Sequence, residues 1–196
     1  MPNKLPAISI SPRLLLLFPA VLLIMPFPWI LAVLCSVLIH ELCHITAARL
    51  LGKRIFLVSV STSGAEIQTD MMNDMEEMIV SLSGPASCLL TLLLARYFPR
   101  LAVCSVIHAI YNLLPLYPLD GGRAFRCITR LLLPRKAADK ITSVVEIGCI
   151  LILSLVFLGM AVFLRMGILP IITGVMFAVR YRSRKKSCKD SQLRVQ

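Results

Sequence analysis

Two histidines and a glutamate stand close together in the stretch Ile39-His40-Glu41-Leu42-Cys43-His44. In an α-helix, residues four positions apart lie on one face about 6 Å apart, so the imidazoles of His40 and His44 can meet a single ion. Zn²⁺ is the usual ion for such a pair, and a glutamate directly after the first histidine lies close enough to handle the proton of a water on the metal. The pattern therefore predicts zinc chemistry with Glu41 as the general base.

The surroundings of this motif decide between a metal site and a hydrogen-bonded polar patch in a helical bundle. The motif lies inside an apolar run from about Pro28 to Leu51, which is long enough to cross a membrane. A charged group at the centre of a membrane helix costs about 2.5 kcal/mol or more, so ionisable side chains are seldom found there without a function. We therefore interpret the motif as a metal site.

The composition is that of a membrane protein. Of the 196 residues, 58% are hydrophobic and 16% are charged, and the apolar runs leave little chain for a separate soluble domain. We expect residues 1–182 to form one membrane domain and residues 183–196 to form a basic cytoplasmic tail. The 7 cysteines include no Cys-x-x-Cys pair, so no disulfide framework is predicted.

The apolar segments predict an all-α polytopic membrane protein with about six transmembrane helices. The expected spans are about 14–25, 28–51, 78–97, a fourth from residue 101, 141–164 and 166–179. Between the second and third spans, residues 55–61 are β-branched and aromatic, residues 62–64 suit a turn, and residues 65–69 alternate apolar with polar. This pattern indicates a small membrane-associated β-hairpin, with an ordinary loop as the alternative. An unwound substrate could be added to the edge of such a hairpin. Residues 123–140 are expected to form an interfacial amphipathic helix.

The positive charges predict the orientation of these spans. With both termini in the cytoplasm, all Lys and Arg residues lie inside except Arg96, Arg100 and Arg165, as the positive-inside rule requires. The net charge of +11 is thus explained by topology, and no nucleic acid is expected as a partner. The chain is predicted to be a multi-pass protein of the cell membrane whose active site lies toward the cytoplasmic half.

A second polar stretch runs from Asn112 to Asp120 within the fourth span. Pro115 and Pro118 exclude an undisturbed helix there, and irregular backbone at membrane depth is tolerated where protein or a water-filled cavity surrounds it. Asp120 would be costly beside lipid, and zinc held by two histidines lacks a third protein ligand. Asp120 fits that role, with Glu146 in the fifth span as the alternative.

Together these motifs resemble the site-2 proteases, which are intramembrane zinc metalloproteases, and within them the subgroup of stage IV sporulation protein FB. The resemblance rests on the His-Glu-x-x-His motif, on Gly84-Pro85 and on the stretch from Asn112 to Gly121. It implies that Asp120 is the third zinc ligand and that Glu41 is the catalytic base. It also implies that Gly84 and Pro85 bind substrate and that Asn112 holds either the substrate or the developing oxyanion.

The sequence departs from the family pattern at two cysteines near these motifs. The family usually has glycine at the position of Cys43, and it often has asparagine at the position of Cys88. The zinc ligands remain intact, but a substrate contact from position 88 is not expected.

The resemblance also implies an activity. A member of this family hydrolyses a peptide bond in or near the membrane segment of a protein substrate, in regulated intramembrane proteolysis, and activation of a sporulation transcription-factor precursor is one such reaction. The expected partners are a membrane-associated protein substrate, the lipid bilayer, and inhibitory or regulatory membrane proteins. The alternative is a catalytically inactive scaffold or a metal transporter that retains zinc, and the intact Glu41 argues against both.

Overall fold

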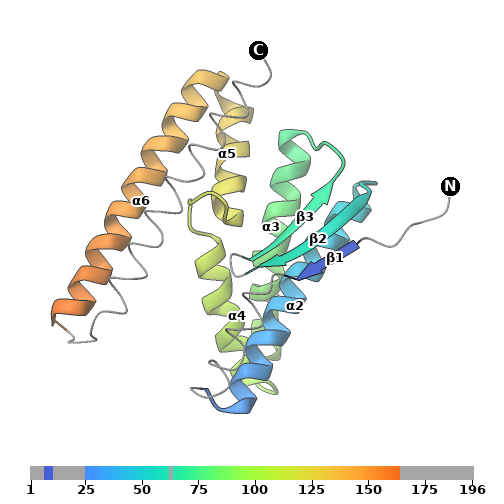
Figure 1. The fold of residues 1–196 in the computed structure, drawn as a ribbon, viewed down its shortest axis with the longest axis vertical. Coiled ribbons are helices and arrows are strands. Elements are labelled where there is room, and N and C mark those ends of the chain that lie inside the picture. The colour runs from blue at the N-terminus through green and yellow to red at the C-terminus, as the bar shows by residue number, and fades with distance from the viewer. Residues whose placement is uncertain (1–6, 11–24, 62–63, 164–196) are drawn as a thin grey trace.

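A computed structural model describes residues 7–10, 25–61 and 64–163 of the chain (Figure 1). Its elements in chain order are β1 (Ala7–Ile10), α2 (Phe27–Leu50), β2 (Ile55–Ser61), β3 (Gly64–Thr69), α3 (Asp74–Leu90), the short 3₁₀ helix η1 (Thr91–Leu94), α4 (Pro99–Asn112), α5 (Asp120–Leu132) and α6 (Arg135–Phe163). Helix α3 packs against α2, α4 and α5, while α6 packs against α5. The core therefore lies around α3.

Helix α2 begins after Pro26 with a proline in its first turn, where a missing N–H is tolerated. It ends at Leu50, and Gly52 follows with a φ of 73°, the left-handed conformation in which glycine commonly terminates helices. Small or polar residues recur at every fourth position on the buried side of α2, namely Ser36, His40, His44 and Ala48.

The outer side of α2 is apolar instead. Several leucines are exposed there, including Leu31, Leu34, Leu38 and Leu42. A helix of a soluble protein has the opposite arrangement, with its apolar stripe toward the core. Small residues at helix contacts and apolar side chains facing outward are typical of membrane helices.

Helix α3 has a well-defined start. Asn73 and Glu76 form a capping box, in which the Glu76 backbone N–H donates to the Asn73 side chain at 2.8 Å and the Asn73 N–H donates to the Glu76 carboxylate at 2.9 Å. These bonds satisfy two N–H groups of the first turn. The helix therefore includes part of the acidic segment that precedes the predicted span at 78–97.

In the described part of the chain, 2 helical segments are long and apolar enough to cross a membrane, Phe27–Leu50 and Asp74–Leu94. They correspond to the second and third predicted spans. The first and last predicted spans, 14–25 and 166–179, lie almost entirely outside the described residues. The total of six spans therefore stays a prediction.

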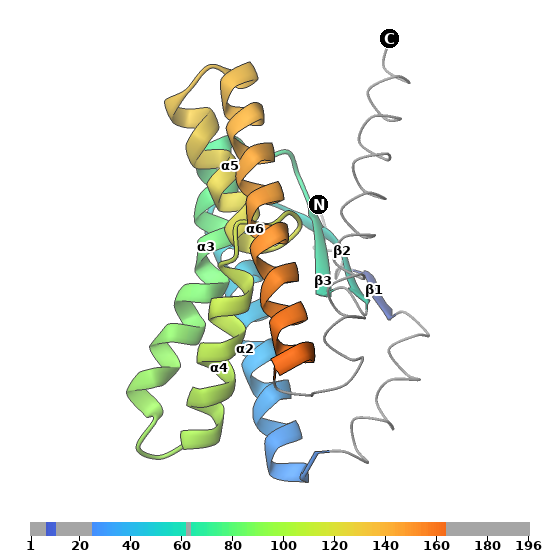
Figure 2. The ribbon, with the colours of Figure 1, turned by 90° about the vertical axis from the view of Figure 1, so that its left-hand side faces the viewer.

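The prediction of one amphipathic helix over residues 123–140 is wrong. Helix α5 ends at Leu132, and α6 begins at Arg135 and continues to Phe163. Pro134 accounts for the break, because a proline pushes the preceding residue out of helical conformation, and Leu133 is extended with φ −133° and ψ 154°. The basic residues of this segment are thus divided between two helices that meet at one end of the molecule (Figure 2).

The strands form a three-stranded sheet in the order β1-β2-β3, which lies beside α2 and contacts it (Figure 1). β2 and β3 are antiparallel, with Ser61 opposite Gly64 and Ile55 opposite Thr69. β1 pairs in parallel with β2, so residues 7–10, which precede the first predicted span, form an edge strand. The association of this sheet with the membrane stays a prediction.

Candidate metal centre

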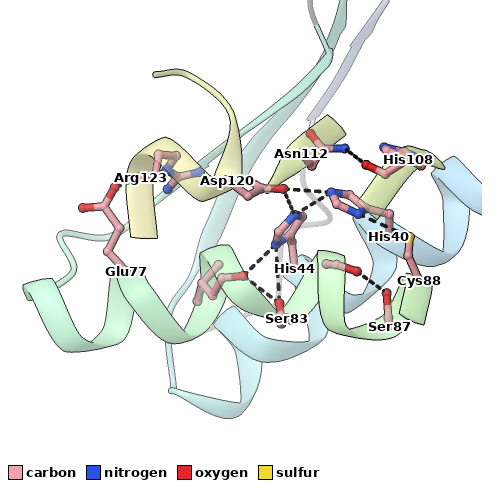
Figure 3. A network of polar contacts seen from close by, with 12 residues as sticks. His40, His44, Glu77, Ser83, Ser87, Cys88, His108, Asn112, Asp120 and Arg123 are labelled. Carbon is pink, nitrogen blue, oxygen red and sulfur yellow. Dashed lines mark hydrogen bonds and ion pairs between the residues drawn. The ribbon is translucent and has the colours of Figure 1, made fainter. Parts of the chain in front are cut away.

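Three buried side chains from two distant segments meet between α2, α3 and α5 (Figure 3). His40 and His44 come from the buried face of α2, and Asp120 is the first residue of α5. Asp120 Oδ2 lies 2.9 Å from His40 Nε2 and 3.1 Å from His44 Nε2. The two Nε2 atoms lie 3.0 Å apart. The structure therefore brings together the two motifs that the sequence indicated.

Hydrogen bonding determines which nitrogen of His44 faces the other two side chains. His44 Nδ1–H donates to the backbone carbonyl of Val80 at 2.7 Å. In a neutral imidazole the other nitrogen is then an unprotonated acceptor, and for His44 this is Nε2. A carbonyl partner of this kind fixes the tautomer and the orientation of metal-binding histidines.

The three side chains fit zinc. One ligand atom from each of His40, His44 and Asp120 lies within 4.8 Å of the others, and two imidazole nitrogens with one carboxylate oxygen form a donor set that zinc prefers. Three protein ligands leave a fourth position open, which is the arrangement of catalytic zinc sites. Such a set of acceptors converging in a buried place is suited to a cation.

Gly84 and Pro85 lie in α3 directly behind these ligands, and both are buried. A Cβ built on Gly84 would overlap with His44 Nε2 and would come within 2.8 Å of His40 Cε1. Glycine is therefore required for α3 to approach the metal-binding face of α2 this closely. The predicted contact of Gly84 and Pro85 with substrate stays a prediction.

The backbone break between α4 and α5 positions Asp120. The turn contains a bond from the Leu119 N–H to the Leu116 carbonyl at 2.7 Å. A Cβ on Gly121 would overlap with the Leu113 carbonyl, and one on Gly122 would overlap with the Leu116 backbone. The two glycines thus allow the first turn of α5 to fold back against the break, which brings the carboxylate to the metal site.

The first turns of α5 are also fixed by side chains. The Arg123 Nε–H donates to the Glu77 carboxylate of α3 at 3.2 Å, and the Arg126 guanidinium lies over the Tyr117 ring at 4.5 Å. The first contact connects α5 to α3, which provides the acceptor for His44. The second connects α5 to the turn that precedes Asp120.

Two further predicted site residues lie at the edge of this cluster. Glu41 follows His40 on α2, is half-buried, and interacts electrostatically with both histidines and with Asp120. Asn112 is the last residue of α4, and its amide Nδ2 donates to the His108 carbonyl at 3.1 Å. One proton of this amide remains for another acceptor.

Glu146, the alternative third ligand, does not join the cluster. It is buried on α6, the helix that packs against α5. Among the described residues, the group able to share one metal ion consists of His40, His44 and Asp120. The geometry therefore favours Asp120 over Glu146.

Sequence reasoning did not indicate several contacts of the histidines, including the following two. The Val80 carbonyl that orients His44 is a backbone atom, and no side-chain pattern indicates it. Cys88 Sγ lies 3.5 Å from His40 Nδ1, and the only signal for it was that a cysteine stands where the resembled family often has asparagine.

Comparison with known proteins agrees with these observations. The sequence profile of peptidase family M50 matches residues 61–155, which include the second polar motif. A zinc metalloprotease of Methanocaldococcus jannaschii is 27% identical over 107 residues, which is 47% of this chain and 32% of the relative. The chain thus spans about a third of the length of that curated relative.

A solved structure has the same fold. The site-2 protease from Methanocaldococcus jannaschii superposes with a TM-score of 0.63 at 21% identity, covering 92% of each chain. These matches confirm the resemblance to the site-2 proteases. The narrower resemblance to stage IV sporulation protein FB stays a prediction.

Proposed function

We propose that this chain, a relative of the site-2 proteases by its match to peptidase family M50 and by its fold, is an intramembrane zinc metalloendopeptidase. The observation that carries the proposal is the convergence of ligand atoms from His40, His44 and Asp120 within 4.8 Å of one another. Glu41 directly follows His40 on the same helix. A structural zinc site is usually closed by four protein ligands, whereas a catalytic site keeps one position for water or substrate.

Zinc, when bound, supplies a Lewis acid that polarises the scissile carbonyl and lowers the pKa of water. His40, His44 and Asp120 would hold it, and the Val80 carbonyl keeps His44 in the required tautomer. Glu41 is the general base, because it directly follows His40 in the sequence and its carboxylate interacts electrostatically with His40, His44 and Asp120. It takes a proton from the attacking water and returns one to the leaving amine.

Asn112 is proposed to bind the substrate backbone or the oxyanion that forms during the attack. Its amide donates to the His108 carbonyl at the end of α4, which fixes the side chain beside the break that precedes Asp120. A preorganised amide donor is suited to stabilise negative charge that develops in the transition state.

The proposed substrate is a membrane-associated protein that is cleaved in or near its membrane segment. This is supported by the exposed leucines of α2, which face outward on the helix that contains the two histidines. The scissile segment must be unwound, because a helical carbonyl is already hydrogen-bonded within its own turn. A sporulation transcription-factor precursor is one candidate, and inhibitory or regulatory membrane proteins are candidate partners.

The proposal is tested by comparing the wild type with Glu41→Gln, co-expressed with candidate single-span or membrane-associated precursors. We expect the variant to lose cleavage while its zinc content, measured on the purified protein, equals that of the wild type. Glutamine removes the base but no ligand, which explains the separation of the two readouts. Retained turnover in the zinc-loaded variant would exclude Glu41 as the base.

A further inference from the structure

The two zinc-binding histidines are held in different ways. His44 Nδ1–H donates to a backbone carbonyl, that of Val80, at 2.7 Å. His40 Nδ1 instead faces the Cys88 thiol of α3, with 3.5 Å between nitrogen and sulfur. Cys88 is fully buried, at 0% exposure, so no bulk water replaces the thiol as a partner.

The ring of His40 is also covered on one face. The imidazole of His108 from α4 stacks on it, with 4.5 Å between the ring centroids and 17° between the planes. His108 is itself contacted by Ser36, whose Oγ lies 3.5 Å from His108 Nδ1 and which is buried on α2. His44, in contrast, meets His40 edge-on at 85°. Among the described residues, a stacked ring therefore covers His40 but not His44.

We propose that Cys88 and His108 are positioning residues for the metal ligand His40. The His40 Nδ1–H donates a hydrogen bond to the Cys88 sulfur, which leaves Nε2 unprotonated and directed toward the ion. The His108 ring holds the plane of the His40 imidazole. The inference rests on the zinc site of the proposed function, and it adds two residues that are not ligands.

A thiol in this role has a specific consequence. Sulfur is a weak hydrogen-bond acceptor, and a carbonyl oxygen is a stronger one. The partner of His40 can moreover be changed by mutation, whereas the Val80 carbonyl belongs to the backbone. Loss of an outer partner of a metal-binding histidine typically weakens metal affinity by about 10–100-fold. Zinc affinity is therefore expected to depend on residue 88.

The test measures zinc affinity of the purified full chain by competition with a chelator, and the visible absorption spectrum of the Co²⁺-substituted protein. Cys88→Ala is expected to weaken zinc binding about 10-fold or more and to alter the cobalt spectrum, since the His40 ring can then rotate. Cys88→Ser keeps a hydroxyl acceptor and is expected to recover part of the affinity.

Cys127→Ala is the matched control for the thiol. Cys127 is also buried, at 1% exposure, but lies on α5, so its truncation removes a similar volume away from His40. The control is expected to retain the affinity and the cobalt spectrum of the wild type. Circular dichroism of each metal-free protein shows whether a variant has folded.

His108 is tested with two variants. His108→Phe keeps an aromatic ring over His40 and is expected to bind zinc more tightly than His108→Ala, which removes the stack. Wild-type affinity and an unchanged cobalt spectrum in both Cys88→Ala and His108→Ala would overturn the proposal. An equal loss in Cys88→Ser and Cys88→Ala would overturn the role of the thiol as acceptor. A wild-type protein that binds no zinc would contradict the proposed function itself.

Discussion

Gly84 of α3 lies against the imidazole of His44 so closely that a Cβ at this position would overlap with His44 Nε2. The same Cβ would come within 2.8 Å of His40 Cε1. A single hydrogen atom in place of a side chain thus determines how closely α3 can approach the metal-binding face of α2.

Gly84→Ala is therefore expected to displace the His44 ring and to lower both zinc content and cleavage. Gly148→Ala is the control, because a Cβ there meets nothing within 4 Å. Metal analysis of the two purified variants checks the prediction. Equal zinc in Gly84→Ala and the wild type would mean that the helices can separate without loss of the site.

Asp120→Asn is expected to reduce zinc occupancy as well as activity, since a neutral amide is a poorer donor and leaves the charge of the ion less compensated in a buried site. Glu146→Gln on α6 is expected to keep full occupancy. Zinc determination on both proteins decides between the two acidic residues. Full zinc in the Asp120 variant together with loss in the Glu146 variant would reverse the assignment.

Asn112→Ala is expected to slow cleavage by about 10²–10³-fold, as removal of one oxyanion donor does in other hydrolases. Zinc content is expected to remain at the wild-type level, because Asn112 contacts the His108 backbone and no ligand. Asn73→Ala is the control, because it also removes an asparagine, the capping residue of α3. It is expected to lower the stability of the protein by about 1 kcal/mol and to leave cleavage unchanged. Comparable cleavage rates in the two variants would exclude the role of Asn112.

The orientation in the membrane can be tested by cysteine labelling from each side of intact cells, in a background without the native cysteines. Arg100→Cys, at the α3–α4 end of the molecule, should react with an impermeant reagent from outside. Lys136→Cys, at the α5–α6 end (Figure 2), should react only after the cytoplasmic face is opened. Both positions are exposed, and the reverse labelling pattern would contradict cytoplasmic termini.

Much of the metal site could be predicted from the sequence because its spacing is local. His40 and His44 are four residues apart on a helix, and that periodicity brings them together whatever the rest of the fold does. Asp120 could be identified because a carboxylate in an apolar span must have a partner. Spacing thus indicated the histidine pair, and the cost of an unpaired carboxylate in an apolar span indicated Asp120.

Other features depend on contacts that no local pattern records. Strand β1 pairs with β2 through backbone groups, and a four-residue segment carries little signal for such a long-range pairing. Residues 123–140 are amphipathic on both sides of Pro134, so their pattern alone predicts one helix, although the proline divides it. The approach of Gly84 to His44 requires the packing of two helices, which spacing along the chain does not give.

His40 and Asp120 are 80 residues apart in the sequence, so the ribosome makes the two histidines well before the carboxylate. A ribosome that has synthesised the chain only through α3 has made both histidines and the Val80 carbonyl, but it has not made the carboxylate. The nascent protein thus inserts its first helices without a complete metal-binding set. The proposed zinc site can be completed only after α5 has been made and the break following α4 has folded back, so a chain that ends before α5 lacks one of its three proposed ligands.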